Sequence, residues 1–279
     1  MNARAEFRVQ TLAPVLSARR LRGRATARAH MVLGLSGLLA LLGVWALCTH
    51  WLTRTTPLAA AMAPVPTFKS LFHLVATNQL TADTLVSLQR VLVSLAAALT
   101  LGIPIGIAVG SSRRFDAATG AVFQFLRMIS PLSWMPIAVM AFGIGNAPIY
   151  FLLTITAIWP IALNTAAGVR QLDARWLLLG RSLGANRRET LRHIIAPGIL
   201  GHVLTGTRVA IGMIWILLIP CEMLGVSSGL GYFILDTRDR LAYSELMAAI
   251  LVIGVLGFLL DGAAQALRAH WFPDQRVLR

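Results

Sequence analysis

Between two strongly apolar stretches lies the basic segment Asp173-Ala-Arg-Trp-Leu-Leu-Leu-Gly-Arg-Ser-Leu-Gly-Ala-Asn-Arg-Arg-Glu-Thr-Leu-Arg-His-Ile-Ile-Ala-Pro197. Its residues predict a helix over 176–183, a turn at Gly184-Ala-Asn, a second helical stretch over 187–195 and a stop at Pro197. Apolar residues recur near helical spacing in the first helix, which leaves the arginines to face water or a partner. Such a helix–turn–helix is a surface on which another protein can act.

The flanking sequence indicates a membrane protein. Of the 279 residues, 57% are hydrophobic and 13% are charged, which is too apolar for a soluble domain. A hydrocarbon core of ~30 Å requires about 20 apolar residues per helix, and the backbone in lipid must satisfy its own hydrogen bonds. Six stretches meet this requirement, at residues 31–52, 84–110, 119–142, 147–169, 199–221 and 245–268. We therefore expect an all-α, polytopic bundle of about six transmembrane helices.

The formal net charge of +14 reflects membrane topology rather than nucleic-acid binding. Arginines gather before the first span, between the second and third spans, and in the 173–197 segment, whereas the alternate connections carry fewer. Because cytoplasmic loops carry an excess of Lys and Arg, both termini and the 171–198 loop are expected in the cytoplasm. Residues 1–52 also resemble a signal peptide, but their apolar stretch exceeds the usual ~7–15 residues, so we favour a retained helix.

Nothing in the sequence predicts catalysis. A P-loop needs Gly-x-x-x-x-Gly-Lys-[Ser/Thr], and the only lysine is Lys69, which follows Phe68. The histidines lack metal-ligand spacing, and Cys48 and Cys221 form no C-x-x-C pair. We therefore expect no catalytic residue, no metal site and no cofactor in this chain.

Two spans carry helix-altering patterns. Gly102, Gly106 and Gly110 are four residues apart, a spacing that permits close helix packing, and we favour packing within the chain over a dimer seam. In the third span, Pro131 and Pro136 disrupt helical hydrogen bonding, which lipid tolerates only inside protein or beside a water-filled cavity. This span is therefore expected to line a translocation path with Ser130, Ser133 and Trp134, the alternative being a simple packed kink.

Charged residues in the spans also need an explanation, because they are costly in a bilayer. Glu222 ends the fifth span and Arg90 lies near the start of the second. We expect an ion pair between them that holds an external gate. The alternatives are that Glu222 reaches the lipid headgroups and that Arg90 faces a vestibule. Asn164, in the fourth span, is expected to form an interhelical hydrogen bond.

The 173–197 segment resembles the cytoplasmic loop of ABC-importer permeases. That loop has Glu-Ala-Ala, three residues, Gly, nine residues and Ile-x-Leu-Pro. Here the glycine is Gly184, the final motif is Ile194-Ile-Ala-Pro197, and the Glu-Ala-Ala positions hold Leu178-Leu-Gly180, so the acidic residue is missing. Further stretches resemble the nitrate/sulfonate/taurine/bicarbonate branch, namely Ser87-Leu-Gln-Arg90, Ile129-Ser-Pro-Leu-Ser-Trp-Met-Pro136, Ile158-Trp-Pro-Ile-Ala-Leu-Asn-Thr165, Thr205-Gly-Thr-Arg208 and Glu222-Met-Leu-Gly.

The resemblance implies a type I importer membrane subunit in the bacterial inner membrane. It implies partner ATPases that bind ATP and Mg²⁺, an extracytoplasmic substrate-binding protein, a second permease copy and membrane lipid, with no nucleic acid. The transported solute would be a small anion such as nitrate, bicarbonate or an organic sulfonate. The residues expected to couple to the ATPases are Arg175, Leu178, Gly180, Arg181, Gly184, Arg187, Arg188, Ile194 and Pro197.

Composition and hydropathy also divide the chain. We expect a basic cytoplasmic tail (1–30), a first transmembrane helix with an external connection (31–83), a permease core (84–270) that includes the coupling loop 171–198, and a C-terminal tail (271–279). Two other functions stay open. An ion-coupled secondary transporter would need a coupling site, for which only Arg90 and Glu222 are candidates, and a scaffold would need the expected cavity to be closed and dry.

Overall fold

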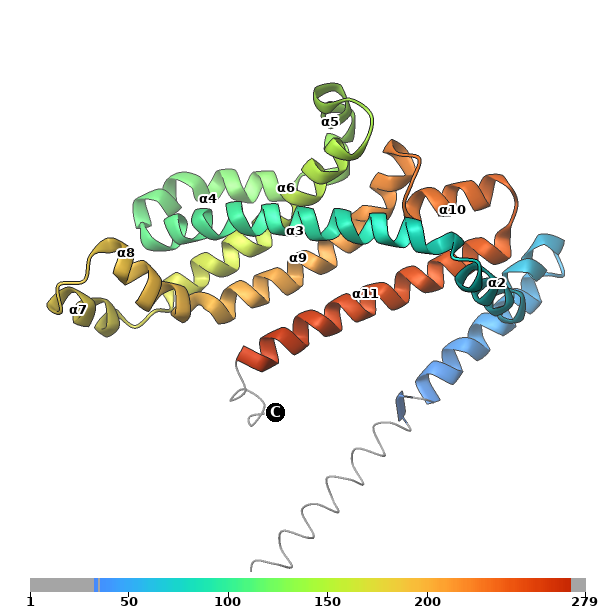
Figure 1. Ribbon diagram of the computed structural model, residues 1–279, viewed down its shortest axis with the longest axis horizontal. Coiled ribbons are helices and arrows are strands. Elements are labelled where there is room, and N and C mark those ends of the chain that lie inside the picture. The colour runs from blue at the N-terminus through green and yellow to red at the C-terminus, as the bar shows by residue number, and fades with distance from the viewer. Residues whose placement is uncertain (1–32, 35, 272–279) are drawn as a thin grey trace, which may run out of the picture. The chain divides into compact units, whose positions relative to one another are not determined.

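The computed structural model describes residues 33–34 and 36–271 (Figure 1). These residues form helices and no strand, as expected for an all-α chain. The predicted tails, 1–30 and 271–279, lie outside this part except for Trp271, which ends the last helix. The chain forms two compact units, 1–68 and 69–279, and each is described by itself.

The first unit contains the apolar helix Ser36–Leu52 and the 3-10 helix η1 (Pro57–Met62). The indole of Trp45 joins them by donating to the carbonyl oxygen of Met62 at 3.1 Å. Helix α2 (Pro64–Ala76) begins in this unit and ends in the second. The described helix at 36–52 is shorter than a full span.

The second unit is a helical bundle. Its elements are α3 (Gln79–Ser111), α4 (Arg113–Met128), η2 (Pro131–Trp134), α5 (Met135–Phe142), α6 (Asn146–Arg170), α7 (Ala174–Ser182), α8 (Arg187–Thr190), the π-helical turn η3 (Leu191–Ile195), α9 (Ala196–Gly225), α10 (Leu230–Asp239) and α11 (Tyr243–Trp271).

Four helices of the described chain are long and apolar enough to cross a membrane, namely Gln79–Ser111, Asn146–Arg170, Arg187–Gly225 and Tyr243–Trp271. The third predicted span, 119–142, is not one helix. It consists of α4 and the segment Pro131–Phe142, which meet at a bend of 87°. Each proline lies in the first turn of a short helix, Pro131 in η2 and Pro136 in α5, because proline lacks an N–H but fits the first helical turn. The described residues therefore hold up to five spans rather than six.

Helix α6 is the centre of the bundle, with α3 and α9 packed against it (Figure 1). Its residues Leu152, Ala157 and Ile161 are fully buried, together with Ala98 of α3 and Ile214 of α9. In the most apolar window of α6, 56% of the residues are buried, against 11% in α11. The apolar surface of α11 is therefore available to lipid or to another chain.

The glycines of α3 pack within the chain, as predicted. A Cβ on Gly102 would lie 3.0 Å from a side-chain carbon of Ile161, and one on Gly110 would lie 2.6 Å from Cβ of Val169. Gly106 is the tightest position, since its Cβ would lie 2.5 Å from both the carbonyl oxygen of Ala162 and Cβ of Thr165. The absence of side chains thus lets α3 and α6 approach closely.

Replacing Gly106 with alanine is expected to push α3 away from α6 and to lower stability by about 1–3 kcal/mol, because the contact includes backbone that cannot yield. The measurement is the thermal unfolding temperature in detergent, followed by tryptophan fluorescence. Gly120→Ala is the matched control, since its Cβ would meet nothing within 4 Å. Equal unfolding temperatures for the two variants would contradict the close approach.

Pro197 does not end a helix, and the predicted stop is wrong. Helices α8 and α9 and the π-helical turn between them run as one helical segment from Arg187 to Gly225. Pro197 lies in the first turn of α9, and the N–H of Ala196 bonds to the carbonyl oxygen of Leu191, five residues back. A π-helical turn absorbs the local mismatch that the proline creates, so the chain continues.

Helices α9 and α11 are joined by polar contacts that the sequence analysis missed. Arg208 of α9 donates to both carboxylate oxygens of Asp261 in α11, at 2.7 and 3.0 Å, and Gln265, one turn further along α11, also donates to Asp261 at 2.6 Å. The indole of Trp215 donates to the carbonyl oxygen of Ile253 at 3.2 Å. These contacts fix how the two helices lie along each other.

Candidate functional site

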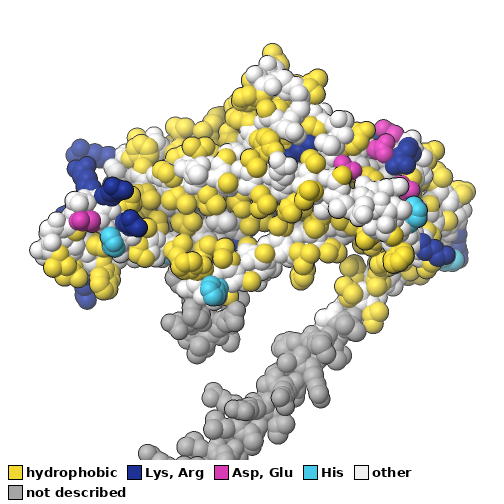
Figure 2. Space-filling view, in the orientation of Figure 1, with side chains coloured by type: hydrophobic (Ala, Val, Ile, Leu, Met, Phe, Trp, Pro, Cys, Tyr) yellow, Lys and Arg dark blue, Asp and Glu magenta, His cyan; other side chains and the backbone are white. Residues whose placement is uncertain are grey.

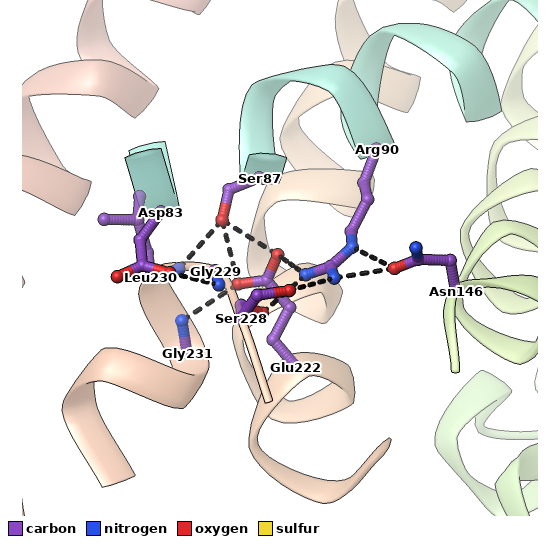
Figure 3. A network of polar contacts seen from close by, with 9 residues as sticks. All are labelled: Asp83, Ser87, Arg90, Asn146, Glu222, Ser228, Gly229, Leu230 and Gly231. Atoms are coloured by element: carbon purple, nitrogen blue, oxygen red, sulfur yellow. Dashed lines mark hydrogen bonds and ion pairs between the residues drawn. The ribbon is translucent and has the colours of Figure 1, made fainter. Parts of the chain in front are cut away.

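A buried ion pair lies at one end of the bundle. Nη1 of Arg90, in α3, is 2.6 Å from Oε1 of Glu222, near the end of α9, and the two side chains are 1% and 0% exposed. The predicted pairing of these two residues is therefore present. Figure 3 shows them at the centre of a polar network drawn from α3, α6, α9 and the start of α10.

All five N–H groups of the Arg90 guanidinium have acceptors. Nε and Nη2 donate to Oδ1 of Asn146, at 3.0 and 2.7 Å. Nη1 donates to Glu222 and to the carbonyl oxygen of Ser228, and Nη2 also donates to Oγ of Ser228 at 3.1 Å. The guanidinium thereby ties α3 to α6, α9 and the loop before α10.

The start of α10 is held by side chains of α3 and α9 (Figure 3). The bonds run from Gly229 N–H to Asp83 Oδ1 at 2.7 Å, from Leu230 N–H to Ser87 Oγ at 2.9 Å and from Gly231 N–H to Glu222 Oε2 at 2.9 Å. The first N–H groups of a helix have no intrahelical partner and carry partial positive charge, so carboxylates suit this position. The network is thus also the N-terminal cap of α10.

Gly229 is required for this arrangement. Its φ of +105° is strained for any other residue, and a Cβ there would lie 2.5 Å from Oε1 of Glu222 and 2.6 Å from Nη1 of Arg90. The glycine lets the backbone of the loop touch the ion pair. A movement of this loop would therefore expose or break the pair.

The predicted translocation-path residues occupy different environments. Arg90 and Glu222 are buried together, whereas Ser130 and Ser133 are exposed at the bend between α4 and α5. Trp134 is half-buried against the apolar core. The bend itself confirms the prediction that helical hydrogen bonding breaks here, while a lining role for the serines stays a prediction.

Asn164 does not form the expected interhelical bond. Its Nδ2 donates to the carbonyl oxygen of Pro160, in its own helix, at 2.8 Å. The amide side chain thus bonds to the backbone one turn earlier in α6 and not to a neighbouring helix.

The 173–197 segment forms a helical hairpin. Helix α7 begins after Asp173, whose carboxylate accepts from the N–H of Arg175 at 2.9 Å. It ends at Ser182, and the predicted turn follows at Gly184, whose φ of +74° is left-handed. Asn186 and Glu189 cap α8 reciprocally, each side chain accepting from the other residue's backbone N–H at 2.9 Å.

The hairpin is closed by one tight contact and is open elsewhere. Gly180 is buried against Ile194. A Cβ added at position 180 would lie only 2.7 Å from Cδ1 of Ile194. Around this contact runs a groove of about 450 Å³, lined by Trp176, Leu179, Gly180, Leu183, Ala185, Glu189, His193 and Ile194. Trp176 is 60% exposed and Leu183 is 77% exposed.

The hairpin therefore presents an apolar groove as well as the predicted basic residues. Arg175, Arg181, Arg187 and Arg188 are exposed, as is Leu178 at the position of the loop glutamate. Figure 2 shows Lys and Arg side chains gathered at the end of the molecule that carries α7 and α8, beside apolar ones. An exposed apolar patch rimmed by charge marks a protein-interaction site.

One continuous helical segment connects the two sites. It begins at Arg187, directly after the hairpin turn, and ends at Gly225, three residues beyond Glu222. At 1.5 Å per residue its length is about 55–60 Å. A single helical element therefore connects the hairpin with the ion pair.

A family model described as "Binding-protein-dependent transport system inner membrane component" matches residues 102–272, which is more than half of the chain. The chain belongs to this family. The matched range contains the hairpin, Glu222 and the long helical segment that joins them.

The chain is also similar to named permease proteins. The chain is 40% identical over 181 residues to the bicarbonate transport system permease protein CmpB of Synechococcus elongatus, a match that covers 64% of this chain and 65% of the relative. It is 37% identical over 190 residues to the nitrate import permease protein NrtB of Synechocystis, covering 68% and 69%. With the taurine transport system permease protein TauC of Escherichia coli the identity is 30% over 266 residues, covering 92% and 95%.

Solved structures show the same fold. An inward-facing MetNI methionine ABC transporter chain matches with a TM-score of 0.54 at 17% identity, covering 66% of this chain and 92% of that one. A chain of an amino acid ABC transporter matches with a TM-score of 0.54 at 15% identity, covering 72% and 96%. The fold is therefore that of type I importer membrane subunits.

Sequence reasoning missed four side chains of the network, namely Asp83, Ser87, Asn146 and Ser228. One signal could have found the first two. Asp83, Ser87 and Arg90 are spaced four and three residues apart, which places them on one face of a helix. Polar residues that lie on the same face of an apolar helix as an arginine indicate that they contact the same neighbouring segment.

Proposed function

We propose that this chain is the membrane permease subunit of an ABC importer. Two copies would form the membrane part, two cytoplasmic ATPases would bind ATP and Mg²⁺, and an extracytoplasmic binding protein would deliver the solute. Family membership supports this proposal, and so do the relatives, which are named as permeases of bicarbonate, nitrate and taurine systems. The solute proposed is accordingly a small anion, either an inorganic oxyanion or an organic sulfonate.

The observation that carries the mechanism is the helical segment Arg187–Gly225, which joins an exposed hairpin to a buried ion pair. ATP binding and hydrolysis would move the hairpin in the groove of an ATPase. The long helix would pass that motion to the Arg90–Glu222 network, which would act as the external gate. Both termini and the hairpin would then lie on the cytoplasmic side, in agreement with the arginine distribution.

The experiment is co-purification from native membrane, followed by ATPase assays with and without candidate binding proteins. We expect an ATPase to accompany the chain and its rate to rise with one loaded binding protein. Transport that survives ATP depletion, with no ATPase subunit recovered under gentle detergent, would instead support an ion-coupled secondary transporter.

The hairpin groove makes a separate prediction about docking. Leu183→Glu is expected to reduce recovery of the ATPase at least tenfold, since it places a charge in the apolar groove. Its unfolding temperature should stay unchanged, because the side chain is 77% exposed. Arg181→Gln is the matched comparison, with an expected loss of only a few fold. The reverse order of effects would show that the arginines, and not the groove, hold the ATPase.

A further inference from the structure

Two hollows flank one ion pair where α3, α4 and α6 meet. The larger hollow, of about 640 Å³, is lined by Val109, Gly110, Ser111, Arg113, Asp116 and Arg170. The smaller, of about 140 Å³, shares Val109, Asp116 and Arg170 with it. Nη2 of Arg170 and Oδ1 of Asp116 are 2.5 Å apart and join α6 to α4 between the hollows. The two hollows are therefore parts of one site.

The site has an excess of positive charge. Arg113 and Arg170 line the larger hollow and Arg127 lines the smaller, against the single carboxylate of Asp116. Within the described part of the chain, Arg113 has no carboxylate within ion-pair distance, and Arg127 bonds only to the neutral Gln124, at 3.1 Å. Figure 2 shows basic side chains gathered at this end of the molecule. Guanidinium groups in this number suit a phosphate or another oxyanion.

One part of the wall of the smaller hollow is apolar. It includes Phe123 of α4 with Leu163, Ala166 and Ala167 of α6. Beside them α4 exposes Phe115, Val122 and Phe125, which are 43%, 53% and 67% accessible. A free inorganic anion gains nothing from such walls, whereas an acyl chain gains burial.

The site lies at the ends of two membrane-spanning helices. The spans α3 and α6 end at Ser111 and Arg170, which are the residues that border the larger hollow. About 20 helical residues already cross the hydrocarbon core, so the ends of α3 and α6, with 33 and 25 residues, are expected outside it, at the level of the headgroups. Basic pockets between transmembrane helices at this level bind anionic headgroups.

We propose that the hollows between α3, α4 and α6 form a binding site for one anionic phospholipid. Arg113 and Arg170 bind its phosphate, and the apolar wall of Phe123 and Leu163 receives the upper part of an acyl chain. The site lies on α4, the first half of the bent span, and its occupancy would hold α4 against α6. The proposal does not depend on which solute is transported.

The test is native mass spectrometry of the purified full chain with phosphatidylglycerol and with phosphatidylcholine of the same acyl chains. We expect phosphatidylglycerol to be retained in preference, and Arg113→Gln to weaken its binding about fivefold, as for loss of one arginine near a lipid surface. Arg113→Gln breaks no ion pair among residues 36–271, so the fold should be unaffected. Arg170→Gln should weaken binding at least as much. Because it breaks the ion pair with Asp116, its matched control is Arg240→Gln at the far end of the unit, which likewise breaks surface ion pairs.

Each other outcome would overturn the proposal. Equal retention of the two lipids, or equal losses in the Arg113 and Arg240 variants, would mean that the arginines select no headgroup. Displacement of the lipid by millimolar inorganic phosphate would identify a site for free anions instead. None of these results bears on ATPase coupling, so the proposal and the importer function fail separately.

Discussion

Replacing Glu222 with glutamine is expected to lower the thermal unfolding temperature by about 10 °C. The substitution keeps the shape of the side chain but leaves the Arg90 guanidinium, 1% exposed, without a counter-charge. Breaking a buried pair by neutralising one partner costs about 3–5 kcal/mol, and in a chain of this size each kcal/mol corresponds to about 2–4 °C. The measurement is thermal unfolding in detergent, with Glu245→Gln as control, because Glu245 pairs with Arg240 at the surface, at 3.5 Å.

The double variant Arg90→Gln, Glu222→Gln separates stability from gating. With both charges removed no uncompensated charge stays buried, so most of the lost stability should return. Transport should still fall at least tenfold while ATP hydrolysis continues, because the loop before α10 is no longer locked by the pair. If the double variant transports at the wild-type rate, the ion pair has a structural role only and is not the gate.

Replacing Gly184 with valine is expected to abolish coupling without unfolding the protein. Gly184 has a φ of +74°, and a Cβ there would meet nothing within 4 Å. The variant is therefore strained by backbone conformation alone, and a β-branched residue tolerates this region worst. The turn would rearrange and misplace α7 relative to α8, so uptake should fall at least tenfold while membrane insertion and the unfolding temperature of the bundle stay unchanged.

Gly184→Asn is the control, because asparagine accepts the left-handed conformation. It should keep most of the uptake. The readouts are uptake into proteoliposomes and ATP hydrolysis by the assembled complex. Normal uptake by the valine variant would remove the hairpin turn from the coupling mechanism.

Hydropathy and local turn chemistry were enough to predict most of the helices and the hairpin. Long apolar stretches can only be helices in lipid, and the left-handed turn at Gly184 follows from its sequence position between two helical patterns. The pairing of Arg90 with Glu222 was also predictable, because an isolated charge in a span needs a partner. Two local predictions were wrong. Pro197 does not stop the helix, because a π-helical turn accommodates it. Asn164 does not bond to a neighbouring helix, because its side chain bonds to the carbonyl oxygen of Pro160 in its own helix.

Only the tertiary structure decided what surrounds the ion pair and where the third span bends. Asn146 and Ser228 reach Arg90 from α6 and from the loop before α10, 56 and 138 residues away in sequence. The two prolines permit a bend in this span but do not fix its angle. The observed 87° depends on how α4 and α5 pack against their neighbours. The sequence by itself determined which segments are helices, because that choice rests on local hydrogen bonding and hydropathy. The contacts between them depend on the whole packed bundle.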